Sequence, residues 1–297
     1  MRYRPLGEAG SAVSAITLTL DAKVAATGEY NIRNLVYAAL EEGVNSFHID
    51  SLDRTLIRTA GAAFAEIDRD LLHISLTIGP LPNRRRDFSV EGVNAVLSAV
   101  LNASGIRYID AIILDDPAES ELPVQTLKVL RADERIMRLG IRGNSDVMDI
   151  YINSGRFDML FTPCHIQLDH RQRGWMRSAR EHQLIVFGTE YYPEALLNAA
   201  KPPPPPEPAK GLFGLSKKKP IEAEPTNPFA FLHQTPGWEA DDLCLAHALL
   251  DPSMGSVVVR SSNVEHLRRL AQACERDMPV SLPAQLEMAR VSASRAT

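Results

Sequence analysis

The sequence has few cysteines, no long apolar run and no excess of basic residues, and each shortage excludes a class of protein. Its three cysteines, Cys164, Cys244 and Cys274, are odd in number and far apart, so they predict neither a disulfide framework nor a paired-cysteine metal site. No apolar stretch reaches membrane-spanning length, and the first residues lack the apolar core of a signal peptide. We therefore expect a cytoplasmic protein with no membrane partner.

Charge and composition narrow the class further. The formal net charge is −5, whereas a dedicated nucleic-acid surface would need a basic stripe, so we expect no nucleic-acid partner. Hydrophobic residues make up 45% and charged residues 23% of the 297 residues, which is typical of a globular protein with a sizeable core. The sequence is expected to form a single domain over residues 1–297, and nothing in it indicates an oligomeric state.

Short apolar runs alternate with amphipathic helical patterns along the chain. The Gly-rich segment 7–10 predicts an N-terminal β-hairpin whose second arm continues to Leu20 as the first strand of a sheet. Segments such as 45–49 and the nearly all-apolar 108–114 are typical of strands, the latter buried on both faces. Eight such strands, each followed by a helix, predict an α/β protein with a (β/α)8 TIM barrel. A last helix within 281–297 is expected to cover one barrel end.

One segment interrupts the alternation before the eighth predicted strand. Residues 201–228 include five consecutive prolines, Pro202 to Pro206, and lack the apolar bulk that packing needs. This composition predicts a disordered proline-rich insertion. Within it, the apolar segment 211–215 and the basic residues that follow could dock onto a protein partner, although a solubilising linker is the simpler interpretation.

Polar and titratable side chains lie at or just after the predicted strands, where a barrel of this kind carries its catalytic mouth. A histidine with two or three carboxylates among them could ligate a divalent cation. No H-x-H or H-E-x-x-H spacing is present, so metal-assisted chemistry is the weakest hypothesis and no metal ligand is assigned. The side chains concerned are Asp21, His48, Asp50, Asp115, Asp116, Cys164, His165 and Glu190.

Several short motifs, taken in order, resemble those of the aldo-keto reductase family, and together they span the chain apart from the insertion. They are Arg2–Gly7 with Val13–Ile16, Gly43–Phe47, Tyr108–Leu114, Arg138–Ile141, Phe157–Leu160 and Glu265–Leu267. The resemblance implies a (β/α)8 barrel that reduces carbonyls with NADPH. It also implies a tyrosine as general acid, a lysine and an aspartate that tune its pKa, and a histidine that orients the carbonyl. Such a donor is needed because hydride addition leaves negative charge on the carbonyl oxygen.

All four catalytic positions implied by the resemblance carry other residues. His48 stands at the aspartate position, Asp53 at the tyrosine position, Thr77 at the lysine position and Asp115 at the histidine position. A carboxylic acid at an exposed mouth is ionised at neutral pH, so Asp53 cannot replace the phenol. The main hypothesis is therefore a pseudoenzyme with a binding or regulatory role, which would use the mouth or the insertion.

The cofactor positions implied by the resemblance are kept only in part. Arg260 and Ser261 stand where some family members keep a Lys-Ser pair that holds the 2′-phosphate of NADPH, and His266 stands where an arginine can occur. Phe187 keeps an aromatic ring where one stacks on the nicotinamide. Other positions have changed. The Ser-Asn pair that holds the nicotinamide amide in the family has become Arg142 and Gly143, and the adenosine-binding Glu-Asn pair has become Arg269 and Leu270. At most residual NADP(H) binding is expected.

An active NADPH-dependent oxidoreductase with a rearranged site is the alternative hypothesis. His48 would then donate the proton, because imidazole titrates near neutrality. The competing interpretation of His48 is a strand-end histidine hydrogen-bonded to Asp50 or Asp115, which we favour.

Overall fold

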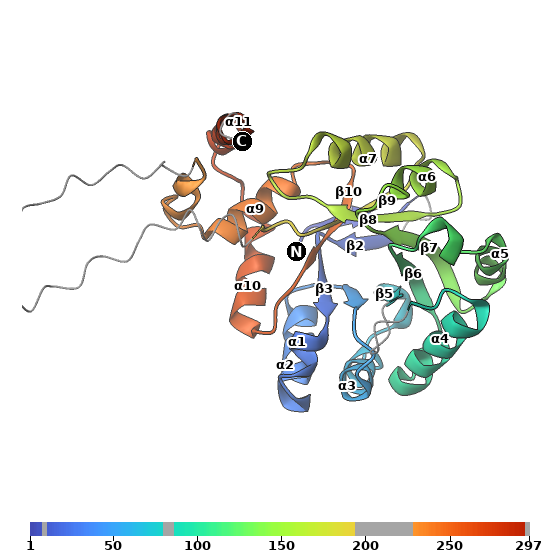
Figure 1. Cartoon of the computed structure of the whole chain (residues 1–297). Coiled ribbons are helices and arrows are strands. Elements are labelled where there is room, and N and C mark those ends of the chain that lie inside the picture. Colours follow the sequence, from blue (N-terminus) through green and yellow to red (C-terminus); the bar gives the residue numbers. More distant parts are fainter. Residues whose placement is uncertain (8–10, 80–85, 194–227, 295–297) are drawn as a thin grey trace, which may run out of the picture.

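The computed structural model describes residues 1–7, 11–79, 86–193 and 228–294. Eight parallel strands close into a barrel in the order β10-β3-β4-β5-β6-β7-β8-β9, which confirms the predicted (β/α)8 fold (Figure 1). The predicted insertion at 201–228 falls between β9 and β10 in the chain but, apart from Pro228, lies outside the described residues. The barrel strands are β3 (Ile16–Leu20), β4 (Ser46–Ile49), β5 (His73–Ile78), β6 (Ile109–Asp115), β7 (Ile136–Arg142), β8 (Met159–Pro163), β9 (Ile185–Thr189) and β10 (Met254–Val259).

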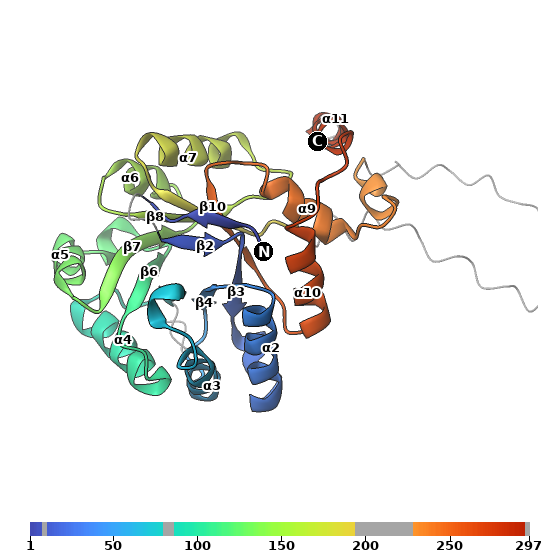
Figure 2. The ribbon, with the colours of Figure 1, turned by 180° about the vertical axis from the view of Figure 1, so that it is seen from behind.

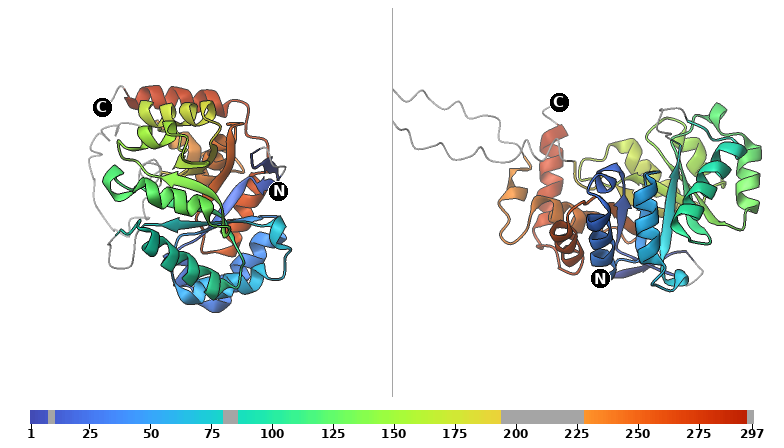
Figure 3. Two further views of the ribbon diagram at one scale, coloured as in Figure 1. Left: turned by 90° about the vertical axis from the view of Figure 1, so that its right-hand side faces the viewer. Right: turned by 90° about the horizontal axis from the view of Figure 1, so that it is seen from below.

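Helices surround this barrel in every view (Figures 1, 2 and 3). Their inner faces and the outer faces of the strands form one continuous apolar core, as expected for parallel strands that are covered by helices. None of the helices in the described ranges is long and apolar enough to cross a membrane. The helices are α1 (Ala22–Ala25), α2 (Glu29–Glu41), α3 (Arg54–Phe64), α4 (Val90–Ser104), α5 (Val124–Ala132), α6 (Met148–Asn153), α7 (His170–Glu181), α9 (Ala240–Ala248), α10 (Val264–Ala273) and α11 (Leu282–Ser294).

The N-terminal hairpin closes the end of the barrel where the strands begin. Strands β1 (Tyr3–Pro5) and β2 (Ala12–Ser14) pair antiparallel, and Figure 2 shows β2 crossing the barrel strands. Leu6 and Val13 are buried in one cluster with side chains of the barrel interior. The last helix does not cover a barrel end as predicted, because α11 lies outside the barrel near α9 and buries Leu286 there (Figure 1). The apolar side chains of the hairpin already fill that end.

The barrel interior has a polar side and an apolar side. On the polar side, the hydroxyl of Thr17 donates to Ser46 Oγ at 2.7 Å and lies 2.7 Å from Ser256 Oγ, and Ser46 Oγ lies 3.2 Å from Nδ1 of His73. These contacts satisfy polar groups that water does not reach. The apolar side is formed by β6, β8, β9 and β10, through Ala111, Ile113, Met159, Phe161, Phe187 and Val258. This division places the predicted site residues of β4 and β5 among hydroxyl groups.

Candidate functional site

A cavity of about 800 Å³ opens where the barrel strands end. Its wall includes the last residues of β6 to β9, as expected for the mouth of a (β/α)8 barrel. The described residues around it are charged, polar and aromatic, and few are aliphatic. They are His48, Arg86, Asp115, Asp116, Arg142, Gly143, Asn144, Phe161, Pro163, His165, Thr189, Glu190, Tyr191, Tyr192, Pro193, Asp241, Val258, Arg260 and His266.

His48 lies at the floor of this cavity with only 1% of its surface exposed. Strands β4 and β5 pair with His48 opposite Ser75, and this register places both ring nitrogens beside hydroxyl groups. Nδ1 lies 2.8 Å from Ser75 Oγ, and Nε2 lies 2.9 Å from Thr77 Oγ1. The ring also packs against Phe161, with 5.0 Å between centroids. Since its partners are hydroxyls on the neighbouring strand, the predicted hydrogen bond to Asp50 or Asp115 is wrong.

This environment determines the protonation state of His48. Burial lowers the pKa of His48 to about 3; the charges of Arg142 and Arg260 add to that effect, and Asp50 opposes it. The ring is therefore neutral at pH 7. Each ring nitrogen also has a hydroxyl partner, so neither is available to a ligand in the cavity.

Two of the predicted catalytic positions lie outside the cavity wall. Asp53 is exposed at the N-terminus of α3, where its carboxylate accepts the backbone N–H of Leu56 at 2.8 Å. This contact caps α3 and leaves Asp53 apart from the cavity. Thr77 is buried on β5 and uses its hydroxyl on His48. The structure thus brings His48 and Thr77 into direct contact but separates Asp53 from both.

The fourth position, Asp115, belongs to a network of charges at the mouth. Arg142 Nε donates to Asp115 at 2.7 Å, and both terminal nitrogens of Arg142 lie 3.4 Å from Asp50. Arg260 approaches Asp50 at 3.3 Å and Asp21 at 3.8 Å. Burial works to raise the pKa of Asp50, but the charges around it, including Arg142 and Arg260, outweigh that effect and lower it. Asp50 is therefore ionised, and Arg142 is held between two carboxylates.

The predicted stacking role of Phe187 disagrees with the structure. Its side chain is fully buried in the barrel interior, with the ring stacked on Phe161 at 5.0 Å and on His73 at 5.4 Å between centroids. His73 opens β5, so Phe187 points toward the end of the barrel that the hairpin closes. Among the described residues the aromatic rings at the cavity are instead those of Phe161, Tyr191 and Tyr192.

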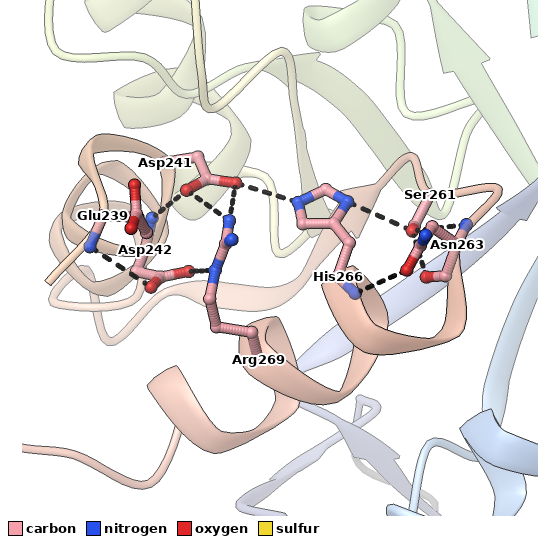
Figure 4. A network of polar contacts seen from close by, with 7 residues as sticks. All are labelled: Glu239, Asp241, Asp242, Ser261, Asn263, His266 and Arg269. Carbon is pink, nitrogen blue, oxygen red and sulfur yellow. Dashed lines mark hydrogen bonds and ion pairs between the residues drawn. The ribbon is translucent and has the colours of Figure 1, made fainter.

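Two of the other predicted cofactor residues, Ser261 and His266, lie together around the start of α10 (Figure 4). Ser261 Oγ lies 3.1 Å from Nδ1 of His266, and Nε2 of His266 lies 2.8 Å from a carboxylate oxygen of Asp241. Arg269 contacts the same carboxylate at 2.7 and 2.8 Å. Arg260 lies apart from this group and is largely exposed, so it is the most accessible of the predicted cofactor residues.

The eight candidate metal-binding residues do not form one cluster. No group of three or more His, Cys, Asp or Glu side chains suited to a metal ion occurs in the part of the chain that the structure describes. Asp50 and Asp115 are bound to Arg142, and Asp21 caps α1. Cys164 is buried, and burial raises the pKa of its thiol far above the usual value, so it stays protonated and is a poor ligand.

Sequence reasoning missed Asp241 as a site residue and named Arg142 and Arg269 only as changes from the family pattern. Asp241 sits in the first turn of α9 and carries no motif, so nothing in the sequence brought it to the mouth. The backbone conformation also marks Asp116 and Glu190 as candidate site residues, and only a structure shows it. Their backbones adopt φ values of 47° and 50°, which non-glycine residues rarely adopt, and both line the cavity.

No family model matches the chain, and no curated protein matches its sequence. Among solved structures, the chain matches aldo-keto reductase AKR11C1 from Bacillus halodurans, in its holo form, with a TM-score of 0.74. That match covers 97% of this chain and 96% of the other, at 18% sequence identity. The chain has the fold of an aldo-keto reductase. An identity this low establishes the fold alone, so the match confirms the architecture expected from the motifs. Any chemistry has to be inferred from the residues at the barrel mouth.

Proposed function

We propose that the protein is an aldo-keto reductase-like pseudoenzyme, which binds a small molecule at the barrel mouth and does not reduce carbonyls. The contacts of His48 carry this proposal. A reductase of this fold needs a proton donor beside the carbonyl oxygen. His48 is neutral, buried and hydrogen-bonded to Ser75 and Thr77 through both ring nitrogens, so it does not fill that role.

The two acids at the other catalytic positions, Asp53 and Asp115, are also unsuited to proton donation. Asp53 caps a helix outside the cavity, and Asp115 accepts a hydrogen bond from the guanidinium of Arg142. The phenol of Tyr191 does line the cavity, but burial raises its pKa well above the usual value, with Asp241 adding to the effect. A phenol that has become a weaker acid is the opposite of what carbonyl reduction requires.

The cavity nevertheless suits a small ligand. Its volume of about 800 Å³ falls in the range typical of small-molecule sites. Arginine and carboxylate side chains are both present on its wall, where Arg142 pairs with Asp115 and His266 contacts Asp241. Aromatic surface is offered by Tyr191 and Tyr192. A ligand of low net charge with a flat apolar part matches this wall best.

The residues present do not fit NADP(H), the cofactor that the family resemblance implies. Phe187 is not at the mouth, Arg142 is held between Asp50 and Asp115, and His266 is engaged by a carboxylate. Exposed Arg260 is the residue that supports residual binding. The solved neighbour is a holo form, which makes cofactor binding a necessary test for this chain. A protein partner for residues 201–228 stays a prediction, because that segment lies outside the described residues.

The experiment is an NADPH oxidation assay with a panel of aldehydes and ketones, run beside a thermal-shift screen of small molecules. We expect no carbonyl-dependent oxidation above the blank. We also expect at least one compound of low net charge to raise the melting temperature, with the effect reduced in Arg260→Ala and kept in Arg58→Ala, whose side chain lies away from the cavity. Turnover that disappears in His48→Ala or Tyr191→Phe would establish the oxidoreductase hypothesis instead.

A further inference from the structure

Asp241 is bound by two basic side chains of α10 (Figure 4). A terminal nitrogen of Arg269 lies 2.8 Å from one carboxylate oxygen and 2.7 Å from the other. Nε2 of His266 lies 2.8 Å from the second of these oxygens. The carboxylate therefore receives N–H groups from both an arginine and a histidine, although Asp241 itself belongs to α9.

The first turn of α10 holds this arrangement in place. Asn263 accepts the backbone N–H of His266 at 3.1 Å, and Ser261 accepts the backbone N–H of Asn263 at 3.2 Å. The hydroxyl of Ser261 also lies 3.1 Å from Nδ1 of His266, so the imidazole is bound at both nitrogens. Arg269 is further fixed by Asp242, which accepts from its Nε at 3.0 Å. The basic groups are thus positioned before any ligand arrives.

The carboxylate at the centre of this group is ionised and faces the cavity. Burial works to raise the pKa of Asp241, but the hydrogen bond from His266 and the charge of Arg269 outweigh it and lower the pKa. Asp241 and His266 both line the cavity at the mouth. A negative charge is therefore fixed where a ligand would meet these basic groups.

The donors that hold Asp241 are those that proteins use for phosphate. Guanidinium groups bind carboxylate and phosphate oxygens alike, through charge-assisted N–H contacts. A phosphate entering here would have to displace Asp241 from Arg269 and His266, and it would still lie beside that negative charge. Repulsion between the phosphate and the partly buried carboxylate of Asp241 would weaken binding of the phosphate.

We infer that Asp241 is an internal occupant of an anion site formed by His266 and Arg269, and that it excludes phosphorylated ligands, NADPH among them, from this end of the cavity. Of the residues that the family resemblance linked to the 2′-phosphate, Ser261 and His266 are then already engaged in this group, whereas Arg260 lies apart from it. The inference rests on the contacts of Asp241 and holds whether or not the barrel turns over carbonyls.

The test measures NADPH and NADH binding to the full-length chain by isothermal titration calorimetry, since these nucleotides differ only in the 2′-phosphate. Asp241→Asn removes the charge and keeps the size of the side chain. We expect the variant to bind NADPH at least roughly tenfold more tightly than the wild type, with a much smaller change for NADH. Asp241→Ser provides a second variant, and the melting temperature of each shows that it is folded.

Glu265→Gln is the matched control. Glu265 lies in the first turn of α10, next to His266, with its side chain 85% exposed, and it pairs only loosely with Arg268, at 3.6 Å. The same change in charge there should leave NADPH affinity within about twofold, because solvent screens exposed charges. An equal gain in Glu265→Gln, no gain in either Asp241 variant, or wild-type affinity for NADPH as high as that of the variants would overturn the inference. Tight NADPH binding by the wild type without carbonyl turnover would leave the proposed function intact.

Discussion

Replacing Arg142 by methionine should destabilise the protein, because it leaves two acids at the barrel mouth without their main partner. Arg142 binds Asp115 at 2.7 Å and Asp50 at 3.4 Å, and its side chain is 20% exposed. The acids are 13% exposed at Asp50 and 23% exposed at Asp115. Methionine fills a similar volume without a charge, so the change isolates the lost ion pairs.

The size of the effect follows from this partial burial. Removing one partner of a fully buried ion pair costs about 3–5 kcal/mol, because the other charge stays buried and unpaired. Both acids retain some contact with solvent, and Arg260 stays 3.3 Å from Asp50. We therefore expect a loss of about 2–3 kcal/mol in the free energy of unfolding at pH 7.

The loss should also depend on pH. In the wild type the pKa of Asp50 is lowered on folding, so its contribution to stability is present above the pKa of the unfolded chain and disappears as pH falls through the folded pKa. In Arg142→Met, the pKa of Asp50 should rise, because burial still acts on it and the charge of Arg142 no longer opposes that effect. Protonation then relieves the buried charge as the solution becomes acidic. The difference between variant and wild type should accordingly shrink between pH 7 and about pH 4.5.

Urea unfolding followed by circular dichroism at both pH values measures these differences. Arg58→Met is the control, because Arg58 pairs with Glu29 at 3.0 Å on the exposed surface. Such pairs contribute less than about 1 kcal/mol. If Arg142→Met cost no more than Arg58→Met, or if its cost grew at acid pH, the assignment of Arg142 as the charge that stabilises the mouth would be refuted.

Two further predictions concern backbone packing and a helix cap. Gly61→Ala should lower the free energy of unfolding by about 2 kcal/mol or more, because a Cβ there would lie 2.1 Å from the carbonyl oxygen of Ser104. Gly174 also lies within a helix but has open space around it, so Gly174→Ala should raise the free energy of unfolding by about 0.5–1 kcal/mol. Urea unfolding measures both changes. Asp53→Ala should cost about 1 kcal/mol through the lost cap of α3, while Asp53→Asn should cost less and neither change should alter ligand binding in calorimetry.

Much of the fold could be predicted from sequence because strands buried on both faces are apolar along their whole length. Residues 108–114 show this pattern and become most of β6. The pattern was less informative about partners. The last helix buries Leu282 and Leu286 but leaves Met288 exposed, and periodicity does not specify which surface a helix packs against. The hairpin arm likewise divides into β2 and β3 around Ala15, where Ser14 donates its hydroxyl to the carbonyl of Ile16.

The sequence predicted that the residues at the four catalytic positions differ from those of the family pattern. The motif positions located His48 and Asp115 at the strand ends, and both reached the cavity. Their partners depended on strand register and on helices distant in the chain, which sequence alone does not fix. His48 faces Ser75 because β4 and β5 pair in that register, and Asp241 reaches His266 because α9 packs beside α10. The predicted position of Phe187 at the mouth was wrong for a related reason. The motif does not specify how far along the barrel axis a side chain of a strand lies.

The most direct test of the account is an NMR titration of the His48 ring in the intact protein, with His48→Gln used to assign its signals. The ring is expected to stay neutral from pH 8 down to pH 5, because burial lowers its pKa to about 3. An ordinary midpoint near 6.5 would show an accessible imidazole that can donate a proton at neutral pH. That result would contradict the proposal of a pseudoenzyme and would make His48 the first candidate for the acid of a working reductase.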